Sequence, residues 1–191
     1  MKNALVPVFV LSTVALILVS GCGPSKGLSL VERRQEVMNM EEDTLQRLYR
    51  EEPATKAKIR DSAGYGVFRN ANVNLILASA GGGHGVVVNN STGKRTYMKM
   101  ALGGIGLGLG VKDYRQVLIF KNAETLNTFV TSGWEFGGHV DAAAKAGSSG
   151  GELSGEGDIS PNIEAYSMTE TGLALQATVA GTKYWKDDSL N

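Results

Sequence analysis

The apolar residues between residues 29 and 52 recur with the period of a helix. Ser29 and Glu32 have the spacing of a capping box, which satisfies free amides at a helix start. Arg34 and Glu41 interrupt the apolar stripe, so we expect this helix to be only partly buried. The stripe, about a third of the helix surface, is formed by Leu30, Val31, Val37, Met38, Leu45, Leu48 and Tyr49.

A second, shorter helix is predicted from Pro53 to about Asp61, because proline suits the first turn of a helix. From Gly64 onward the pattern changes to short apolar runs separated by glycine and asparagine, which indicates strands and turns. The predicted strands are Tyr65 to Arg69, Val73 to Ser79, Val86 to Asn89, Thr96 to Leu102 and Gln116 to Lys121. The predicted turns are Asn70 to Asn72, Gly81 to Gly85 and Asn89 to Gly93.

The last third of the chain predicts one helix among further strands. Asn122 is a suitable N-cap for a helix from Ala123 to Thr131. Strands are predicted over Trp134 to Val140, Ile163 to Met168 and Leu173 to Val179, with a loop from Ala142 to Pro161. The predicted fold is therefore α+β: a curved, mostly antiparallel, glycine-rich β-sheet with N-terminal helices and one internal helix.

Glycine alternates with larger apolar residues from Gly104 to Val111. In a strand, this alternation gives one bare face that another element can approach closely. No glycine here is followed by glycine at both the second and the fifth position, so the dinucleotide-binding fingerprint is absent, and so is the lysine of a phosphate-binding loop. We therefore expect no cofactor.

The first residues have the pattern of a secretion signal, with Lys2 ahead of an apolar run that is too short for a good membrane span. Leu18 to Cys22 resembles the lipobox of bacterial lipoproteins, which implies acyl chains such as palmitate on Cys22. Two or more such chains anchor a protein stably. Gly23 follows the cysteine, where retention in the inner membrane usually requires aspartate, so we expect outer-membrane sorting. The expected organisation is a signal peptide (1–21), a lipidated linker (22–28) and one domain (29–191).

The composition excludes several kinds of site. A single cysteine rules out an intrachain disulfide and a cysteine-rich metal centre. His84 and His139 have only Asp141 near them as a further ligand, which is a weak basis for a metal site. Gly147 to Gly151 matches the spacing of a hydrolase nucleophile, but no histidine lies downstream. We expect neither a metal ion nor an enzyme activity.

The chain has no net charge, but its charges are segregated along the sequence. Residues 22–52 carry a net charge of −2, residues 53–121 of +8, and residues 122–191 of −7. The basic and acidic segments either meet in the fold or form separate faces. If they are separate, the basic segment attracts anionic headgroups; the alternative is solvated charges that discourage strand-edge pairing. The candidate lipid-binding residues are Lys94, Arg95, Lys99, Lys112 and Arg115.

Five motifs occur in one order over residues 45 to 185: Ala63 to Phe68, Gly83 to Val88, Gly104 to Phe120, Phe129 to Gly138, and Ala165 to Leu173. In this order they resemble the SYLF domain, also called the Ysc84 or DUF500 domain. The resemblance implies a compact α+β domain that binds membrane phospholipids, phosphoinositides in eukaryotic members, and actin in the yeast namesake. Bacterial members are often exported lipoproteins, which agrees with Cys22.

The sequence departs from the family in two places. Arg95 to Lys99 stands where members commonly have a Trp-Ser-x-Pro segment. The N-terminal helix, the proposed membrane contact of relatives, carries seven acidic and four basic residues between Glu32 and Glu52, and acidic surfaces are poor partners for anionic lipid. We therefore assign the lipid contact to the basic segment.

The function expected from these observations is non-catalytic phospholipid binding by a lipoprotein of the cell envelope, anchored in the outer membrane and facing the periplasm. The alternative is a structural or scaffolding envelope protein that binds other proteins through the acidic loop Ala142 to Pro161. Nucleic acid is not expected as a partner of an exported protein.

Overall fold

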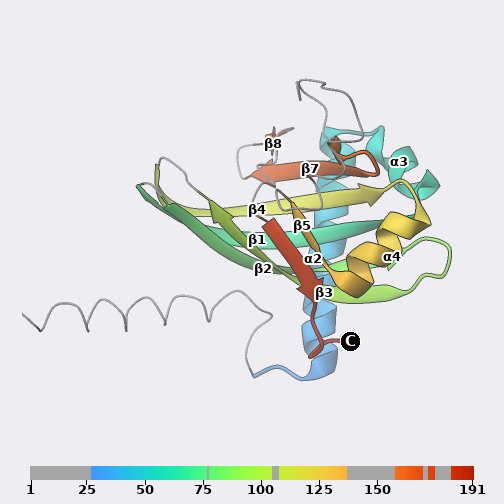
Figure 1. Ribbon diagram of the computed structural model, residues 1–191, viewed down its shortest axis with the longest axis horizontal. Coiled ribbons are helices and arrows are strands. Elements are labelled where there is room, and N and C mark those ends of the chain that lie inside the picture. The colour runs from blue at the N-terminus through green and yellow to red at the C-terminus, as the bar shows by residue number, and fades with distance from the viewer. Residues whose placement is uncertain (1–26, 77, 105–107, 137–157, 170–171, 175–181) are drawn as a thin grey trace, which may run out of the picture.

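The computed structural model describes residues 27–76, 78–104, 108–136, 158–169, 172–174 and 182–191 (Figure 1). Within these residues the helices are α2 (Leu30–Glu51), α3 (Thr55–Asp61) and α4 (Ala123–Ser132). The strands are β1 (Gly64–Ile76), β2 (Ala78–Asn89), β3 (Arg95–Gly104), β4 (Gly108–Phe120), β5 (Trp134–Phe136), β6 (Asp158–Ser160), β7 (Ile163–Thr169), β8 (Gly172–Ala174) and β9 (Thr182–Lys186).

The starts of α2 and α4 follow the predicted capping residues, whereas α3, predicted from Pro53, begins at Thr55 without a side-chain cap. The Ser29 hydroxyl accepts from the amide of Glu32 at 3.3 Å, and the Glu32 carboxylate accepts from the amide of Ser29 at 2.8 Å, so the capping box is confirmed. The Asn122 side chain accepts from the amide of Thr125 at 2.8 Å and begins α4. Each cap satisfies a backbone donor that has no partner inside the helix.

All the strands belong to one antiparallel sheet with the order β5-β9-β3-β2-β1-β4-β7-β6, and β8 pairs with β7. The predicted α+β class with a curved antiparallel sheet is confirmed. Figure 1 shows α2 behind the sheet, crossing the strands at a steep angle, and α4 in front of it.

The turns predicted at Asn70 to Asn72 and Gly81 to Gly85 are wrong, because β1 and β2 run through both segments. Residues 64 to 75 of β1 pair continuously with residues 89 to 78 of β2, and β1 also pairs with β4 along its other edge. Ladders on both edges of a strand override the turn preference of asparagine and glycine. The turn after Asn89 is confirmed, and Gly93 adopts a positive φ of 68° there.

The later predictions are confirmed only where the structure describes the chain. The helix from Ala123 and the strand from Ile163 are both present. Of the strands predicted from Trp134 and from Leu173, only β5 and β8 lie within the described residues. Residues 158–160, predicted as loop, form β6 by pairing with β7. Residues 142–157 of the acidic loop and the centre of the glycine alternation (105–107) lie outside the described residues.

Each face of the sheet has its own hydrophobic core. We call the face covered by α2 and α3 the outer face, and the face covered by α4 the inner face. The outer face packs against α2 and α3 through Val37, Met40, Leu48 and Ile59 from the helices, over Val67, Val86, Val88, Tyr97, Val117, Ile119, Tyr166 and Met168 from the strands. The inner face packs against α4 through Leu126 and Phe129, over Phe68, Val87, Met98, Met100, Leu118, Phe120, Phe136, Ile163, Ala165 and Tyr184.

The sheet curls around its inner face, and glycine residues on that face permit the curl because they have no side chain. A Cβ on Gly85 would lie 2.5 Å from the Phe68 ring and 2.1 Å from the Val67 carbonyl oxygen. Glycine therefore lets the Phe68 ring lie flat against β2, where its centroid is 4.8 Å from that of Tyr184. Tyr184 in turn reaches across the inner face to β4, where its hydroxyl donates to the Gln116 side-chain oxygen.

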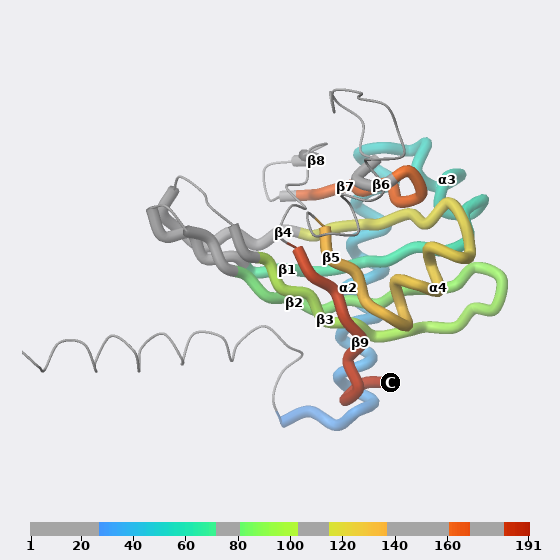
Figure 2. The backbone as a smooth tube through the Cα atoms, in the orientation of Figure 1, coloured from blue at the N-terminus to red at the C-terminus, as the bar shows by residue number. Residues whose placement is uncertain are grey.

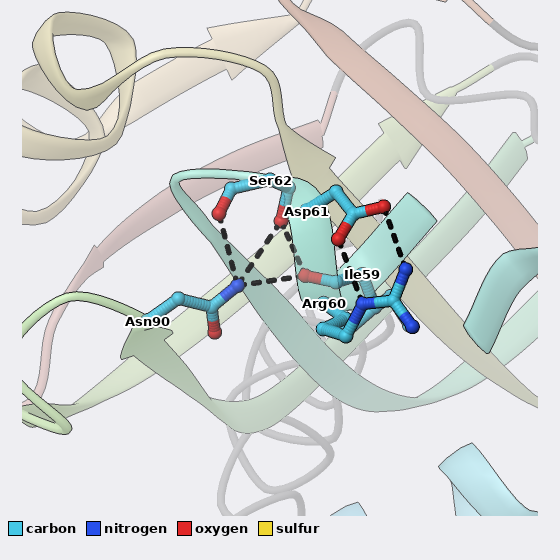
Figure 3. A network of polar contacts seen from close by, with 5 residues as sticks. All are labelled: Ile59, Arg60, Asp61, Ser62 and Asn90. Carbon is cyan, nitrogen blue, oxygen red and sulfur yellow. Dashed lines mark hydrogen bonds and ion pairs between the residues drawn. The ribbon is translucent and has the colours of Figure 1, made fainter. Parts of the chain in front are cut away.

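The end of α3 holds the turn that precedes β3 (Figure 3). The Asn90 side-chain nitrogen donates to the Ile59 carbonyl at 2.7 Å and to the Ser62 carbonyl at 3.0 Å. The Ser62 hydroxyl also donates to the Ile59 carbonyl at 2.8 Å. These bonds satisfy carbonyls at the C-terminus of the helix, and they fix the position from which β3 begins.

The C-terminal segment 187–191 continues the edge of the sheet beside β3 and ends near the start of α2, as Figure 2 shows. The Tyr97 amide donates to the Asn191 side-chain oxygen at 3.0 Å, and the Tyr97 carbonyl accepts from the Asn191 side-chain nitrogen at 2.7 Å. Leu190 is buried between these elements. The segment therefore joins the first helix to the sheet.

Candidate functional site

A basic pocket of about 660 Å³ lies at the edge of the sheet where β3 begins and β9 has ended. Such a volume is typical of small-ligand sites. The pocket brings together side chains from α2, β3, α4, β9 and the C-terminal segment, four of which are cationic. Its walls are formed by Arg34, Lys94, Arg95, Thr96, Tyr97, Val130, Thr131, Lys186, Leu190 and Asn191.

Arg34 is held in place on one side of the pocket. Its Nε donates to the Leu190 carbonyl at 2.7 Å, and its guanidinium carbon lies 5.6 Å from the centroid of the Tyr97 ring. The interaction with the ring and the bond to the carbonyl both restrict the side chain without neutralising its charge. The interruption that Arg34 makes in the apolar stripe of α2 is therefore explained by this pocket.

Arg95 is held by a buried carboxylate. Its guanidinium lies 2.5 Å from a Glu41 carboxylate oxygen, and Glu41 is only 4% exposed. The Tyr65 hydroxyl donates to the other oxygen of Glu41 at 2.8 Å. Burial, with the nearby Glu41 charge, raises the pKa of Tyr65, so this hydroxyl remains a donor. Glu41, the second interruption of the stripe, thus orients Arg95 and offsets part of its charge.

Lys94 and Lys186 are both exposed at the pocket. Within the part of the chain that the structure describes, neither ammonium group has an acidic partner. As far as the described residues go, the pocket therefore combines two oriented guanidinium groups with two ammonium groups that have no acidic partner. This arrangement favours an anion, because Arg matches the planar geometry of phosphate or carboxylate and Lys supplies a mobile point charge.

The other predicted lipid-binding residues lie away from the pocket. Lys99 forms an ion pair with the buried Asp187 at 3.1 Å. Arg115 donates to the Thr44 hydroxyl of α2 at 3.2 Å. Lys112 is in β4, where the structure describes its backbone pairing with Asn72. The five candidates therefore do not form one patch: Lys94 and Arg95 share the pocket, and Lys99 and Arg115 contact other elements.

Basic and acidic segments of the sequence meet in the fold. Lys58 of α3 contacts Glu164 of β7 at 2.6 Å and the Tyr166 hydroxyl at 2.9 Å. Burial, together with the bond to Glu164, raises the pKa of Tyr166 to about 12. With the Lys99–Asp187 pair, this contact joins the basic middle of the chain to its acidic C-terminal third.

Sequence reasoning missed Arg34 and Lys186 as members of this site. The sequence did mark Arg34, because a cationic residue within an apolar stripe needs either a partner for its charge or a functional role. Lys186 carried no such signal, since it lies 92 positions after Lys94 and joins the pocket only through the pairing of β9 with β3.

The remaining sequence predictions of sites fall largely outside the described residues. Cys22, His139 and the Gly147 to Gly151 segment are not described, and His84 lies within β2. In the described part of the chain, no three His, Cys, Asp or Glu residues are placed to hold a metal ion. The described helices also include none that is both long and apolar enough to cross a bilayer.

Comparisons with known proteins agree with the resemblance seen in the sequence. Residues 101–191 match the model of the Ysc84 family, described as Las17-binding protein actin regulator. Beta cell expansion factor A of Aeromonas veronii is 37% identical over 159 residues, which cover 83% of this chain and 59% of that protein. The chain therefore matches about three-fifths of the length of this relative.

Proposed function

Because residues 101–191 belong to the Ysc84 (SYLF) family, we propose that the protein is a non-catalytic lipoprotein of the bacterial cell envelope that binds anionic phospholipid headgroups. The basic pocket is the observation that carries this proposal. Its four cationic side chains come from α2, from the start of β3 and from β9, and internal contacts fix two of them, Arg34 and Arg95. A pre-oriented basic site of this kind suits the phosphate of a lipid headgroup.

The proposed lipid anchor at Cys22 would place the basic pocket close to the membrane surface. Cys22 precedes the N-cap Ser29 by seven residues, which span at most about 25 Å when extended. Arg34 lies little more than one helical turn beyond the cap, and the exposed Leu30 and Val31 lie between them. Acyl chains on Cys22 would therefore hold the pocket within reach of the leaflet, where each basic residue adds attraction to anionic lipid.

Vesicle co-sedimentation tests the headgroup site. The soluble segment 22–191 carrying Cys22→Ser has no acyl anchor, so pelleting reports the protein surface alone. We expect it to pellet at low salt with vesicles of phosphatidylethanolamine that contain phosphatidylglycerol, and not with phosphatidylethanolamine alone. Lys94→Gln with Lys186→Gln should weaken this binding roughly 30-fold, since each basic residue contributes about 1 kcal/mol near an anionic surface.

The matched control removes two positive charges elsewhere. Lys56→Gln with Arg60→Gln alters exposed residues of α3 and keeps the same net charge as the pocket variant. Binding should then remain close to that of the parent. Equal losses in both variants would mean that net charge alone drives association, and no pelleting with anionic vesicles would refute the proposal.

Outer-membrane anchoring through Cys22 is the second part of the proposal. It is supported by the lipobox-like segment and by Gly23 after the cysteine. Fractionation of the cell envelope after labelling with an alkyne fatty acid tests it directly. The label should appear on the parent chain in the outer-membrane fraction and be lost in Cys22→Ser.

The alternative function, a scaffold that binds other envelope proteins, is favoured by a different observation. Arg95 and Lys99 are paired with the buried acids Glu41 and Asp187, which leaves fewer charges for lipid. Pull-down from envelope extracts, with and without residues 142–157, separates the two functions. A scaffold would lose its partners on deletion, whereas headgroup binding would persist.

A further inference from the structure

The basic pocket lies across the edge of the sheet, so its cationic side chains are divided between the two faces. Arg95 is two residues before Tyr97 in β3 and therefore shares the outer face, to which Arg34 of α2 also belongs. Lys186 is the partner of Met98 across the β3–β9 ladder, so its side chain points to the inner face. The β3 edge thus separates the two guanidinium groups from the Lys186 ammonium group.

The inner half of the pocket is completed by α4 and by the first residues of β3. Val130 and Thr131 come from α4, which covers the inner face and lies opposite α2 in Figure 1. Thr96 alternates with the outer-face residues of β3 and points to the inner face. The Asn89 amide donates to the Lys94 carbonyl at 3.0 Å, so the ladder extends to Lys94. Alternation then places the Lys94 side chain on the same face as that of Thr96.

The backbone edge between the two halves is open at Arg95. The ladder of β9 with β3 begins at Met98, and the Asp187 amide extends it by donating to the Tyr97 carbonyl at 3.0 Å. In an antiparallel strand, alternate residues direct their amide and carbonyl to the same side. The amide of Arg95 therefore faces this edge, and within the described residues no strand pairs with it there. A ligand that crosses the edge can accept a hydrogen bond from this amide.

A single phosphate cannot compensate the cations of both halves. Arg95 and Lys186 start about 10 Å apart along the edge, because three residues of β3 separate Arg95 from the partner of Lys186. A phosphate in bidentate contact with a guanidinium group leaves the ammonium groups of the other face without an anion. The volume of about 660 Å³ is also that of a site for a whole small molecule rather than for one ion. Two linked phosphates would compensate both halves.

The uncharged part of the pocket lining suits a short polar linker. The Thr131 hydroxyl donates to the Asn127 carbonyl at 2.7 Å, so it can accept a hydrogen bond from a ligand hydroxyl. Thr96 adds a second hydroxyl to the lining. Val130 and Leu190 offer apolar contact to carbon atoms. A glycerol or sugar unit between two phosphates has this combination of hydroxyl groups and carbon.

We propose that the basic pocket binds a lipid headgroup in which a short hydroxylated linker joins two phosphates. One phosphate pairs with Arg34 and Arg95 on the outer side, and the other pairs with Lys94 and Lys186 on the inner side. The linker crosses the β3 edge beside the Arg95 amide. This inference rests on the proposed headgroup binding and adds the class of headgroup: a lipid with two phosphates, such as cardiolipin, is preferred to one with a single phosphate. The proposed anchor at Cys22 favours a lipid over a free bisphosphate.

Vesicle co-sedimentation at matched surface charge tests the proposal. The segment 22–191 with Cys22→Ser contains every described helix and strand. One set of phosphatidylethanolamine vesicles contains cardiolipin, and the other contains phosphatidylglycerol at twice the molar amount, so both surfaces carry the same phosphate charge. We expect half-maximal binding to cardiolipin at an about tenfold lower concentration of lipid phosphate, because the second phosphate is supplied by the same molecule.

Substitutions on one side of the edge should remove this preference. Lys186→Gln should lower it to about threefold, since half of the inner charge is lost, and adding Lys94→Gln should abolish it. Lys183→Gln is the matched control, because it removes one positive charge from an exposed, outer-face position of the same strand. This control should keep the preference of the parent. A preference that the double variant retains would overturn the proposal.

The outcomes separate this inference from the proposed function. Absence of pelleting with either anionic vesicle would refute headgroup binding and this inference with it. Equal binding to both vesicles would overturn this inference and leave headgroup binding in place. Calorimetric titration with fructose 1,6-bisphosphate separates a free ligand from a lipid: we expect the free sugar to bind about tenfold more weakly than cardiolipin vesicles, since the leaflet adds its own attraction. Tighter binding of the sugar would overturn the assignment to a lipid.

Discussion

The Tyr184 hydroxyl donates a hydrogen bond to the Gln116 side-chain oxygen although β3, β2 and β1 lie between their strands in the sheet order. In a flat sheet, four strand spacings of about 4.8 Å would hold these residues nearly 20 Å apart. The bond therefore measures how strongly the sheet curls. It also places a hydrogen bond beside the aromatic side chains of the inner face.

Tyr184→Phe removes this hydroxyl and keeps the ring that packs on Phe68. The Gln116 oxygen is then left buried without its donor, so we expect a loss of about 1 to 3 kcal/mol in the free energy of unfolding. Urea denaturation measures it. Trp185→Phe, at an adjacent and partly exposed position, should cost less than about 0.5 kcal/mol. Equal losses would show that the cross-sheet bond does not stabilise the curl.

Glu41→Ala should destabilise the contact between α2 and the sheet. It removes the buried acceptor of both Arg95 and Tyr65, and we expect a cost of about 1 to 3 kcal/mol, because Arg95 is partly exposed and can regain water. The pKa of Tyr65 should fall towards its ordinary value, which an ultraviolet titration would record. Glu42→Ala removes an exposed neighbouring acid and should change neither quantity.

Stability should depend on pH through Asp187. Burial opposes ionisation of this carboxyl, but hydrogen bonds from Ser189 and Lys99 outweigh it and hold the pKa below the ordinary value of 3.8. A lowered folded-state pKa means that the stabilisation is present above about pH 4 and is lost as the pH falls through the folded value. Asp187→Asn should therefore be less stable than the parent at pH 7, and the difference should shrink in acid. A constant difference would contradict this.

Asn90→Ala should loosen the turn before β3. The variant removes the donor to the Ile59 and Ser62 carbonyls, at a cost of about 1 to 2 kcal/mol for bonds of this kind. Because this turn precedes Lys94 and Arg95, vesicle binding should also weaken. Asn127→Ala, on the exposed side of α4, is the matched change and should leave both stability and binding as they are. If Asn90→Ala keeps the stability and the vesicle binding of the parent, strand pairing alone holds the turn.

Local chemistry predicted where α2 and α4 begin, and tertiary pairing decided the strands. Ser29 and Asn122 cap helices through bonds within three residues, so a short stretch of sequence contains the whole interaction. Asn70 lies in a segment typical of turns, yet it continues β1 because β2 and β4 pair along both edges. No window of local sequence contains those partners.

The same reason limits how much of the site could be predicted. Lys94 and Arg95 are adjacent in a basic segment, and charge alone selects them. The charge count could not show that Glu41 lies against Arg95 or that Asp187 pairs with Lys99, because each contact depends on the sheet and on α2 together. The charge of the segment therefore left open whether its basic residues form a separate face or meet acidic residues, and the fold pairs two of them with buried acids.

The C-terminal segment has a consequence for the order in which the molecule can fold. Tyr97 is paired with Asn191, 94 residues later in the chain, and Arg34 bonds to Leu190 across 156 residues. While the ribosome makes the intervening residues, the edge of β3 has neither β9 nor residues 187–191 to cover it. An uncovered strand edge can pair with other chains. In a nascent chain this edge would thus stay open to pairing with other chains until residues 187–191 arrive.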